Sequence, residues 1–201
     1  MKTTILFFLT ILSLVGCSKD SAGSKTDPIF QLPPETQTGA NTFGVTIRGK
    51  VYVPRDPKGV NFGAPAHGLK LLGGGTVPNE YSELIVVDGA SVVGFKITIH
   101  IQNLNGVGVF NLRQSNFENQ ADSILENHIF FKIWDSKISN YAYYGSKENE
   151  GEVTINRLSN GILSGNFRGN FVRYDNPNEF IQINDGRFDI NSFTIQDKIF
   201  P

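Results

Sequence analysis

Polar and apolar residues alternate with a period of two along most of the chain, which is the pattern of strands with one buried face and one face in water. In the clearest run, residues 95–102, polar residues separate Phe95, Ile97, Ile99 and Ile101. Helical spacing of apolar residues is scarce. The pattern predicts an all-β domain built mainly of antiparallel strands.

Turn dipeptides indicate where these strands reverse. Asparagine or aspartate followed by glycine suits the two-residue hairpin turn, because both central residues need a positive φ. Such dipeptides lie between alternating runs at Asp88-Gly89, Asn105-Gly106, Asn160-Gly161 and Asp185-Gly186. We predict a hairpin at each of them, and a fifth at Arg48-Gly49 between residues 43–47 and 51–53.

The longest predicted strand covers residues 162–174. Its apolar face carries Leu163, Gly165, Phe167, Gly169 and Phe171, with polar residues between them. Glycine inside a strand usually marks a bulge or a bend. We therefore expect this strand to curve strongly around the core, as in a corner of a β-sandwich or in a partly closed barrel.

Two segments depart from the strand pattern. Helical spacing relates Phe117, Ala121, Ile124 and Leu125, so residues 115–127 are predicted to form one short helix between strands. Residues 54–78 are rich in glycine and proline and are predicted to form a long, mostly irregular surface loop.

The first 16 residues have the organisation of a secretory signal peptide. A basic start at Lys2 precedes an apolar run from Ile5 to Val15. The run is shorter than the ~20 apolar residues that cross a bilayer, so a permanent transmembrane helix is not expected. We predict that residues 1–16 are removed on export.

The residues Leu14-Val15-Gly16-Cys17 follow this apolar run and resemble the lipobox of bacterial lipoproteins. In that motif the cysteine thiol takes a diacylglyceryl group, with acyl chains such as palmitate, and the leader is cut just before the cysteine. Cys17 is the only cysteine in the chain, so no intramolecular disulfide can form. The resemblance implies a lipoprotein anchored through Cys17, because two or more acyl chains hold a protein stably to a membrane.

The prolines, glycines and polar residues that follow Cys17 cannot bury enough apolar surface to offset the entropy of ordering. Residues 17–42 are therefore predicted to be the lipidated cysteine and a flexible linker, and residues 43–201 a single β-rich domain. Lys19 and Asp20 loosely resemble signals that send some lipoproteins to the cell surface. The alternative is that these two residues are part of a plain solvated linker. The sequence therefore does not decide in which leaflet of the membrane the protein is anchored.

Charge narrows the choice of partners. The chain has 201 residues, 18 basic and 19 acidic, with a formal net charge of −1. The charges are spread along the sequence, so there is no basic stripe to neutralise many phosphates. Nucleic acid is not expected as a partner.

The sequence predicts no metal site and no cofactor. The three histidines, His67, His100 and His128, lack the spacing of metal ligands. Residues 73–76 contain three glycines, but they lack the lysine and the helix of a phosphate-binding loop. The oxygens near the last predicted turn, on Asn184, Asp185 and Asp189, lack the acidic spacing of a calcium loop.

No catalytic residue is predicted either. No serine lies in a nucleophile elbow, and lipid would occupy Cys17. Two groups of carboxylates remain, and a sequence cannot place them across a cleft. They are Asp122, Glu126 and Asp135, and, in a predicted solvated hairpin tip, Glu148, Glu150 and Glu152.

The aromatic residues offer a more specific candidate. The chain has 16 Phe, 6 Tyr and a single Trp, and the tryptophan lies close in sequence to three tyrosines. Amphipathic rings suit wet interfaces, so Trp134, Tyr141, Tyr143 and Tyr144 are predicted to bind a glycan or a protein partner. The alternative is that Tyr141 and Tyr143, which share one face at strand spacing, only cover the sheet.

Two stretches resemble an uncharacterised family of outer-membrane lipoproteins. Residues 32–44 (LPPETQTGANTFG) and 49–54 (GKVYVP) are similar to the opening of that family, and residues 183–190 (INDGRFDI) are similar to its closing hairpin. Many members carry a cysteine at the position of Val45. The resemblance implies an outer-membrane location and a β-rich fold, and it supplies no catalytic residues.

Together these observations favour a lipid-anchored, non-catalytic module that binds a ligand or a protein at the outer membrane, its site formed by the aromatic cluster. Two alternatives stay open. One is a hydrolase whose site is assembled only in the fold. The other is a structural component of envelope assembly.

Overall fold

The computed structural model describes residues 30–58, 67–74, 80–117 and 126–201. These residues form ten strands and one short 3-10 helix, so the all-β prediction is confirmed. The predicted helix over residues 115–127 falls mainly on residues 118–125, which lie outside the described part. The elements are β1 (Thr42–Ile47), β2 (Lys50–Tyr52), β3 (Leu69–Gly74), β4 (Tyr81–Asp88), β5 (Phe95–Gln102), β6 (Gly108–Asn111), β7 (His128–Asp135), β8 (Asn140–Ser159), β9 (Ile162–Arg173), β10 (Phe180–Asn191) and η1 (Ile195–Asp197).

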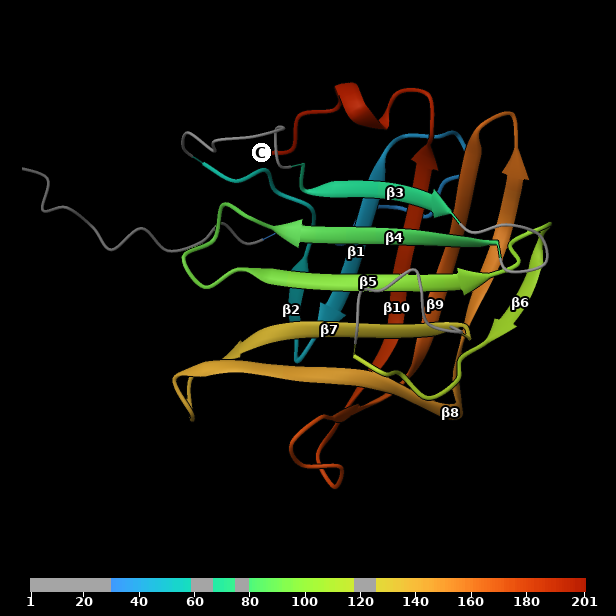
Figure 1. Ribbon diagram of the computed structural model, residues 1–201. Coiled ribbons are helices and arrows are strands. Elements are labelled where there is room, and N and C mark those ends of the chain that lie inside the picture. The colour runs from blue at the N-terminus through green and yellow to red at the C-terminus, as the bar shows by residue number, and fades with distance from the viewer. Residues whose placement is uncertain (1–29, 59–66, 75–79, 118–125) are drawn as a thin grey trace, which may run out of the picture.

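One curled antiparallel sheet makes both layers of the domain. Its strand order is β2-β1-β10-β9-β8-β7-β5-β4-β3, and β6 pairs with β8. In Figure 1, β3, β4, β5 and β7 form a front layer that runs across β1, β10 and β9 behind it. β8 has 20 residues and takes part in both layers. The predicted sandwich or partly closed barrel is confirmed, because the sheet forms a half-barrel.

The core lies between the two layers. Phe131 of β7 is fully buried and contacts two rings from neighbouring strands. It stacks on Tyr144 of β8 with ring centroids 5.4 Å apart, and it meets Phe171 of β9 edge to face, also at 5.4 Å. These contacts join the front layer to the back layer.

The strand prediction for residues 162–174 is confirmed as β9, and its predicted apolar face lies inward. The bulges lie in its two neighbours. Register breaks occur in β8 around residues 146–151 and 155–157, and in β10 between Ile183 and Gly186. The β9 glycines permit close approach of backbones: a Cβ on Gly165 would lie 2.2 Å from the carbonyl oxygen of Thr154. Residues 148–152, predicted to be a hairpin tip, lie within β8.

Two of the predicted hairpin turns are confirmed. Arg48-Gly49 joins β1 to β2, with φ values of 50° and 77°. Asn160-Gly161 joins β8 to β9, with φ values of 52° and 73°. Both dipeptides have two successive positive φ angles, as the two-residue turn requires.

The other three turn predictions are wrong in detail. β4 and β5 do pair after Asp88, but residues 89–94 link them in place of a two-residue turn. The strand after Asn105-Gly106, β6, pairs with β8 and not with β5. Gly186 lies inside β10, where the ring of Phe167 would be 2.2 Å from an added Cβ. Glycine serves packing there, not chain reversal.

The predicted irregular loop over residues 54–78 needs a correction. Residues 69–74 form β3, an edge strand that pairs with β4 along its whole length. Gly73 and Gly74, which belong to the glycine run, therefore lie in a strand, with the ring of Tyr81 close to Gly74. Residues 59–66 and 75–78 lie outside the described part.

The two stretches that resemble a lipoprotein family lie against each other. Asp189 of β10 is 1% exposed, and it accepts hydrogen bonds from the side chain of Thr36 and from the backbone N–H groups of Gly39 and Ala40, at 2.6–3.1 Å. Arg187 donates to the carbonyl oxygen of Pro33 at 3.2 Å. Residues 183–190 are a bulged part of β10 and not a hairpin. The C-terminal part of the predicted linker thus lies on the outer side of β10, and residues 17–29 lie outside the described part.

Candidate functional site

Three of the four predicted aromatic residues come together on the outer face of the front layer. Trp134 of β7 lies directly opposite Tyr141 of β8, and their rings meet edge to face at 5.5 Å. Tyr143 follows two residues later in β8 and points to the same side. Trp134 and Tyr143 are 38% and 44% exposed, so their rings are available to a ligand.

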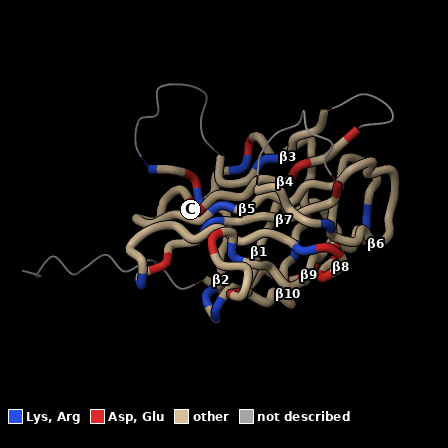
Figure 2. Tube along the Cα trace, turned by 60° about the horizontal axis from the view of Figure 1, so that its bottom comes forward, with Lys and Arg blue, Asp and Glu red and all other residues tan. Residues whose placement is uncertain are grey.

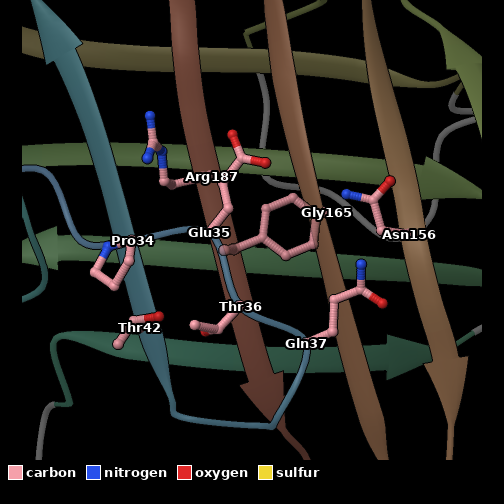
Figure 3. Close-up of a pocket in the computed structure, with 9 residues that line it drawn as sticks. Pro34, Glu35, Thr36, Gln37, Thr42, Asn156, Gly165 and Arg187 are labelled. Carbon is pink, nitrogen blue, oxygen red and sulfur yellow. The ribbon is translucent and has the colours of Figure 1, made fainter.

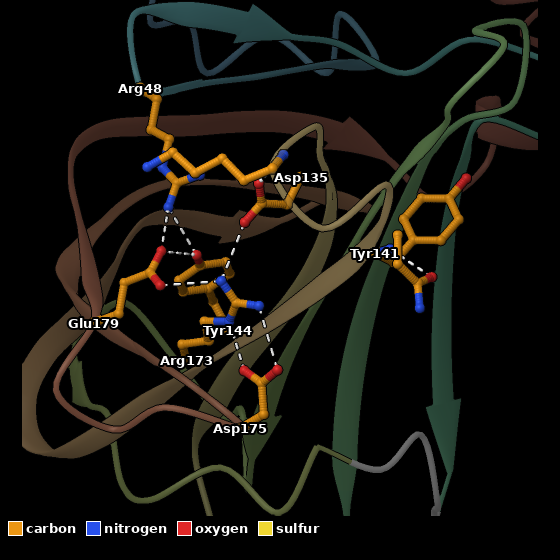
Figure 4. A network of polar contacts seen from close by, with 9 residues as sticks. Arg48, Asp135, Tyr141, Tyr144, Arg173, Asp175 and Glu179 are labelled. Atoms are coloured by element: carbon orange, nitrogen blue, oxygen red, sulfur yellow. Dashed lines mark hydrogen bonds and ion pairs between the residues drawn. The ribbon is translucent and has the colours of Figure 1, made fainter.

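Tyr144 lies apart from this group, because successive residues of a strand point to opposite faces. Its ring is fully buried, and its hydroxyl donates to Glu179 at 2.7 Å and accepts from Arg48 at 2.8 Å. Burial, together with the bond to Glu179, raises the pKa of Tyr144 to about 12. Figure 4 shows Tyr141 well away from these residues.

The polar network around Tyr144 holds one end of the half-barrel together. Arg173 of β9, itself buried, contacts three carboxylates: Asp135 at 3.1 Å, Glu179 at 3.0 Å and Asp175 at 2.5 Å. Figure 4 shows these groups turned toward one another. Because each charged group already has partners inside the network, the geometry favours a structural role here.

Beside the exposed rings lies a hollow of about 210 Å³, here called the lysine hollow. It is lined by Lys96, Phe117, Phe130, Lys132 and Tyr143. Lys96 of β5 and Lys132 of β7 are register partners, and both are half-buried. The ammonium of Lys132 lies 4.7 Å from the ring centroid of Tyr141, within the range of a cation–π contact.

The rings and the lysines therefore form one continuous surface across β5, β7 and β8. We call it the aromatic–lysine face, and it consists of Lys96, Lys132, Trp134, Tyr141 and Tyr143. One end of the hollow is made by the ring of Phe117 over Gly145, where an added Cβ would lie 2.7 Å from ring atoms. Glycine at 145 is thus required for this wall.

Next to the hollow, the outer face of the front layer is more buried than the sequence predicted. Thr98 and His100, expected on a wet face, are 0% and 1% exposed. The ring of His100 stacks between Tyr81 and His128, with centroids 5.3 Å and 5.0 Å away. Its Nδ1 lies 3.0 Å from a carboxylate oxygen of Glu83. Residues on adjacent strands cover each other here, which period-two alternation alone does not reveal.

His128 continues this row of stacked rings and is almost fully buried. Its Nδ1 lies 2.9 Å from the carbonyl oxygen of Glu126. Burial is the main cause that lowers the pKa of His128, so its neutral form is favoured. Among the described residues, no three His, Cys, Asp or Glu side chains are grouped so that they could hold a metal ion.

A second cavity, of about 190 Å³, lies on the back layer. Figure 3 shows Pro34, Glu35 and Thr36 of the N-terminal segment crossing in front of β1 and β10. Arg187 lines this cavity, but two backbone carbonyl oxygens, of Pro33 and Asp185, already accept its hydrogen bonds. The cavity results from the way the N-terminal segment is fastened to the sheet, so it is a weaker candidate than the lysine hollow.

Lys and Arg are interspersed with Asp and Glu over the described chain, as Figure 2 shows. Within the described ranges, the structure has no helix that is long and apolar enough to span a bilayer. Cys17 and the leader lie outside those ranges.

Comparison of the chain with protein-family models, with curated proteins and with solved structures finds no match. The resemblance of residues 32–54 and 183–190 to a lipoprotein family therefore stays a prediction. The site has to be interpreted from its own geometry.

Sequence reasoning missed four residues of the site: Lys96, Phe117, Phe130 and Lys132. A partial signal was present, because Lys132 and Trp134 share the outer face of one strand. The pairing of β5 with β7, which brings Lys96 opposite Lys132, joins strands separated by 25 residues that include β6. Only the fold supplies that register.

Proposed function

We propose that this protein is a lipid-anchored binding module of the cell envelope. It is held to the membrane through Cys17 and binds its ligand at the aromatic–lysine face. The observation that carries the binding role is the continuous surface of two exposed rings, Trp134 and Tyr143, beside a hollow that contains two lysines. Trp, Tyr and cationic side chains in such a cluster are typical of recognition surfaces.

The anchor is supported by the sequence of the leader. A short apolar run ends in Leu14-Val15-Gly16-Cys17, and the protein has no other cysteine. Acyl chains on Cys17 would remove the one free thiol from an exported chain. They would also place the domain next to a bilayer, at the end of the segment that follows residue 17.

Replacing Cys17 by serine is expected to abolish acylation of the N-terminal peptide and with it the lipid anchor. In the expressing bacterium, the wild-type chain should sediment with the envelope, and its N-terminal peptide should carry acyl mass. Cys17→Ser should remain unacylated and should appear in the soluble fraction or keep its leader. Mass spectrometry of the N-terminal peptide gives the readout. An unmodified Cys17 in the wild-type protein would contradict the anchor.

The binding role predicts that Trp134→Ala and Tyr143→Ala lose about tenfold or more in affinity, because both truncations remove ring contact area from the proposed surface. Ligands would be identified on glycan and peptide arrays with the full-length protein, and affinities then measured by calorimetry. Phe180→Ala is the matched control, since Phe180 is an exposed ring at the start of β10. Equal losses in all three variants, or no binding on either array, would contradict the role.

The hydrolase alternative has less support. The one close pair of a histidine and a carboxylate described above is His100 with Glu83, and both side chains are buried. Neither residue lines the lysine hollow. A substrate in the hollow would therefore contact lysines and rings, which suit binding better than acid–base hydrolysis.

A further inference from the structure

Two lysines face each other in the middle of the front layer. Lys96 and Lys132 are direct partners in the antiparallel pairing of β5 with β7, where opposite Cβ atoms are about 4.5–5.5 Å apart. Within the described ranges, neither ammonium has a hydrogen bond or an ion pair with a carboxylate. Like charges in directly opposite positions destabilise a sheet. The pair therefore has a cost for the fold that a bound anion would offset.

The surroundings add positive charge to this pair. Lys70 of β3 lies on the same face and acts on Lys96 electrostatically. Burial, and then the nearby Lys132, lower the pKa of Lys96. Glu83 acts in the opposite direction, but its carboxylate is already 3.0 Å from the ring of His100. An anion would find two half-buried ammonium groups with no carboxylate between them.

The shape of the hollow limits what fits. Its volume of about 210 Å³ is below the range of roughly 300–1,000 Å³ found for pockets that enclose drug-sized molecules. It has room for one charged unit of a larger ligand. The exposed rings of Tyr143 and Trp134 lie beside it and give neighbouring units a flat surface for stacking.

The sheet itself argues against an extended peptide as the ligand. β5, β7 and β8 are interior strands, each paired on both sides. A peptide that binds as an added strand needs a free edge with unpaired N–H and C=O groups. The aromatic–lysine face offers side chains alone, which favours ring stacking and contacts with charged groups.

We infer that the lysine hollow binds the carboxylate or sulfate group of an acidic carbohydrate. The anionic group lies between the ammonium groups of Lys96 and Lys132, and the sugar ring packs on Tyr143. Further units of the chain extend over Tyr141 and Trp134. This inference rests on the proposed binding role of the aromatic–lysine face and specifies its ligand class.

The test uses the full-length protein and short oligomers of galacturonate, alginate and chondroitin sulfate. Methyl-esterified oligogalacturonate is the uncharged counterpart, because esterification removes the charge and keeps the ring. At least one acidic oligomer should bind about tenfold tighter than the ester, and its affinity should fall as salt rises. Lys96→Gln and Lys132→Gln should each weaken binding about tenfold or more. Lys137 is an exposed lysine in the turn after β7, and Lys137→Gln should leave the affinity unchanged.

Thermal unfolding of the free variants separates loss of binding from loss of fold. Lys96→Gln should melt at the wild-type temperature or above it, because it removes a like-charge contact. Lys132→Gln also loses the cation–π contact with Tyr141, so its melting temperature should stay within about 4 °C of the wild type. Unchanged affinity in both lysine variants would overturn the inference, as would failure of every acidic oligomer to bind. Another outcome is that the methyl ester binds as tightly as the acidic oligomers while Tyr143→Ala no longer binds it. That outcome would support the binding role of the aromatic–lysine face and overturn the inference that the ligand is anionic. Tighter binding of a poly-glutamate peptide would overturn the carbohydrate class.

Discussion

Asp189→Ala should lower the free energy of unfolding by about 3 kcal/mol, because the buried carboxylate accepts several hydrogen bonds at once. Its donors are the hydroxyls of Thr36 and Thr38 and the backbone N–H groups of Thr38, Gly39 and Ala40. All of them belong to the segment that precedes β1. Without the carboxylate these N–H groups lose their acceptor, and the segment should detach from β10.

Asp189→Asn tests whether the charge of the carboxylate or the size of the side chain stabilises the fold. The amide has nearly the same size, but its NH2 group would point at N–H donors, so most of the loss should remain. Asp197→Ala removes an exposed carboxylate and should change stability by less than about 0.5 kcal/mol. Urea denaturation at pH 7 measures the free energy of unfolding of all three variants. Equal stability of Asp189→Ala and Asp197→Ala would contradict the role assigned to Asp189.

The same carboxylate predicts a pH dependence. Burial raises the pKa of Asp189, but the hydrogen bonds from Thr36, Ala40, Gly39 and Thr38 outweigh it, and the net shift is downward. A carboxyl with a lower pKa in the folded state stabilises the fold above its unfolded pKa and loses that effect as the pH falls through the folded value. As the pH falls below about 4, the usual pKa of an aspartate, the greater stability of the wild type over Asp189→Asn should therefore decrease progressively.

The second large effect is expected in the core. Phe131→Ala should cost about 3–5 kcal/mol, because a fully buried ring is replaced by a cavity between the two layers. The ring contacts Tyr144 and Phe171, so its loss removes packing on three strands. In a chain of this size the unfolding temperature should fall by about 10 °C, on the order of 2–4 °C per kcal/mol.

Two controls define this result. Phe131→Leu keeps most of the volume and should cost less than about 2 kcal/mol. Phe180→Ala truncates a ring that is 63% exposed and should be nearly neutral. Calorimetry and urea denaturation provide the measurements. If Phe131→Ala and Phe180→Ala unfolded at the same temperature, Phe131 would not be the residue that joins the two layers.

Some elements follow from local sequence because their cause is local. Two-residue turns need two positive φ angles. The dipeptides Arg48-Gly49 and Asn160-Gly161 adopt these angles themselves, without help from distant residues. Alternation over residues 95–102 likewise determines which side of β5 faces the core, because the pleat has a period of two. Neither property depends on the partner strand.

Gly186 shows where such reasoning fails. Asp185-Gly186 has the composition of a turn, yet it lies at a bulge in β10, where the glycine leaves room for the ring of Phe167. The aspartate also has a partner far away in sequence, since Asp185 accepts a hydrogen bond from the N–H of Thr46 at 3.2 Å. The same dipeptide can serve either use, and only neighbouring strands decide between them.

By itself, the sequence determined several strands with their inner faces, among them β5 and β9, and two of the turns. The tertiary structure decided what lies opposite what: Lys96 against Lys132, Asp189 against residues 36–40, and His100 under its neighbours. The physical reason is that backbone conformation and side-chain alternation are local properties. Strand register and burial of an outer face depend on residues that are distant in the chain.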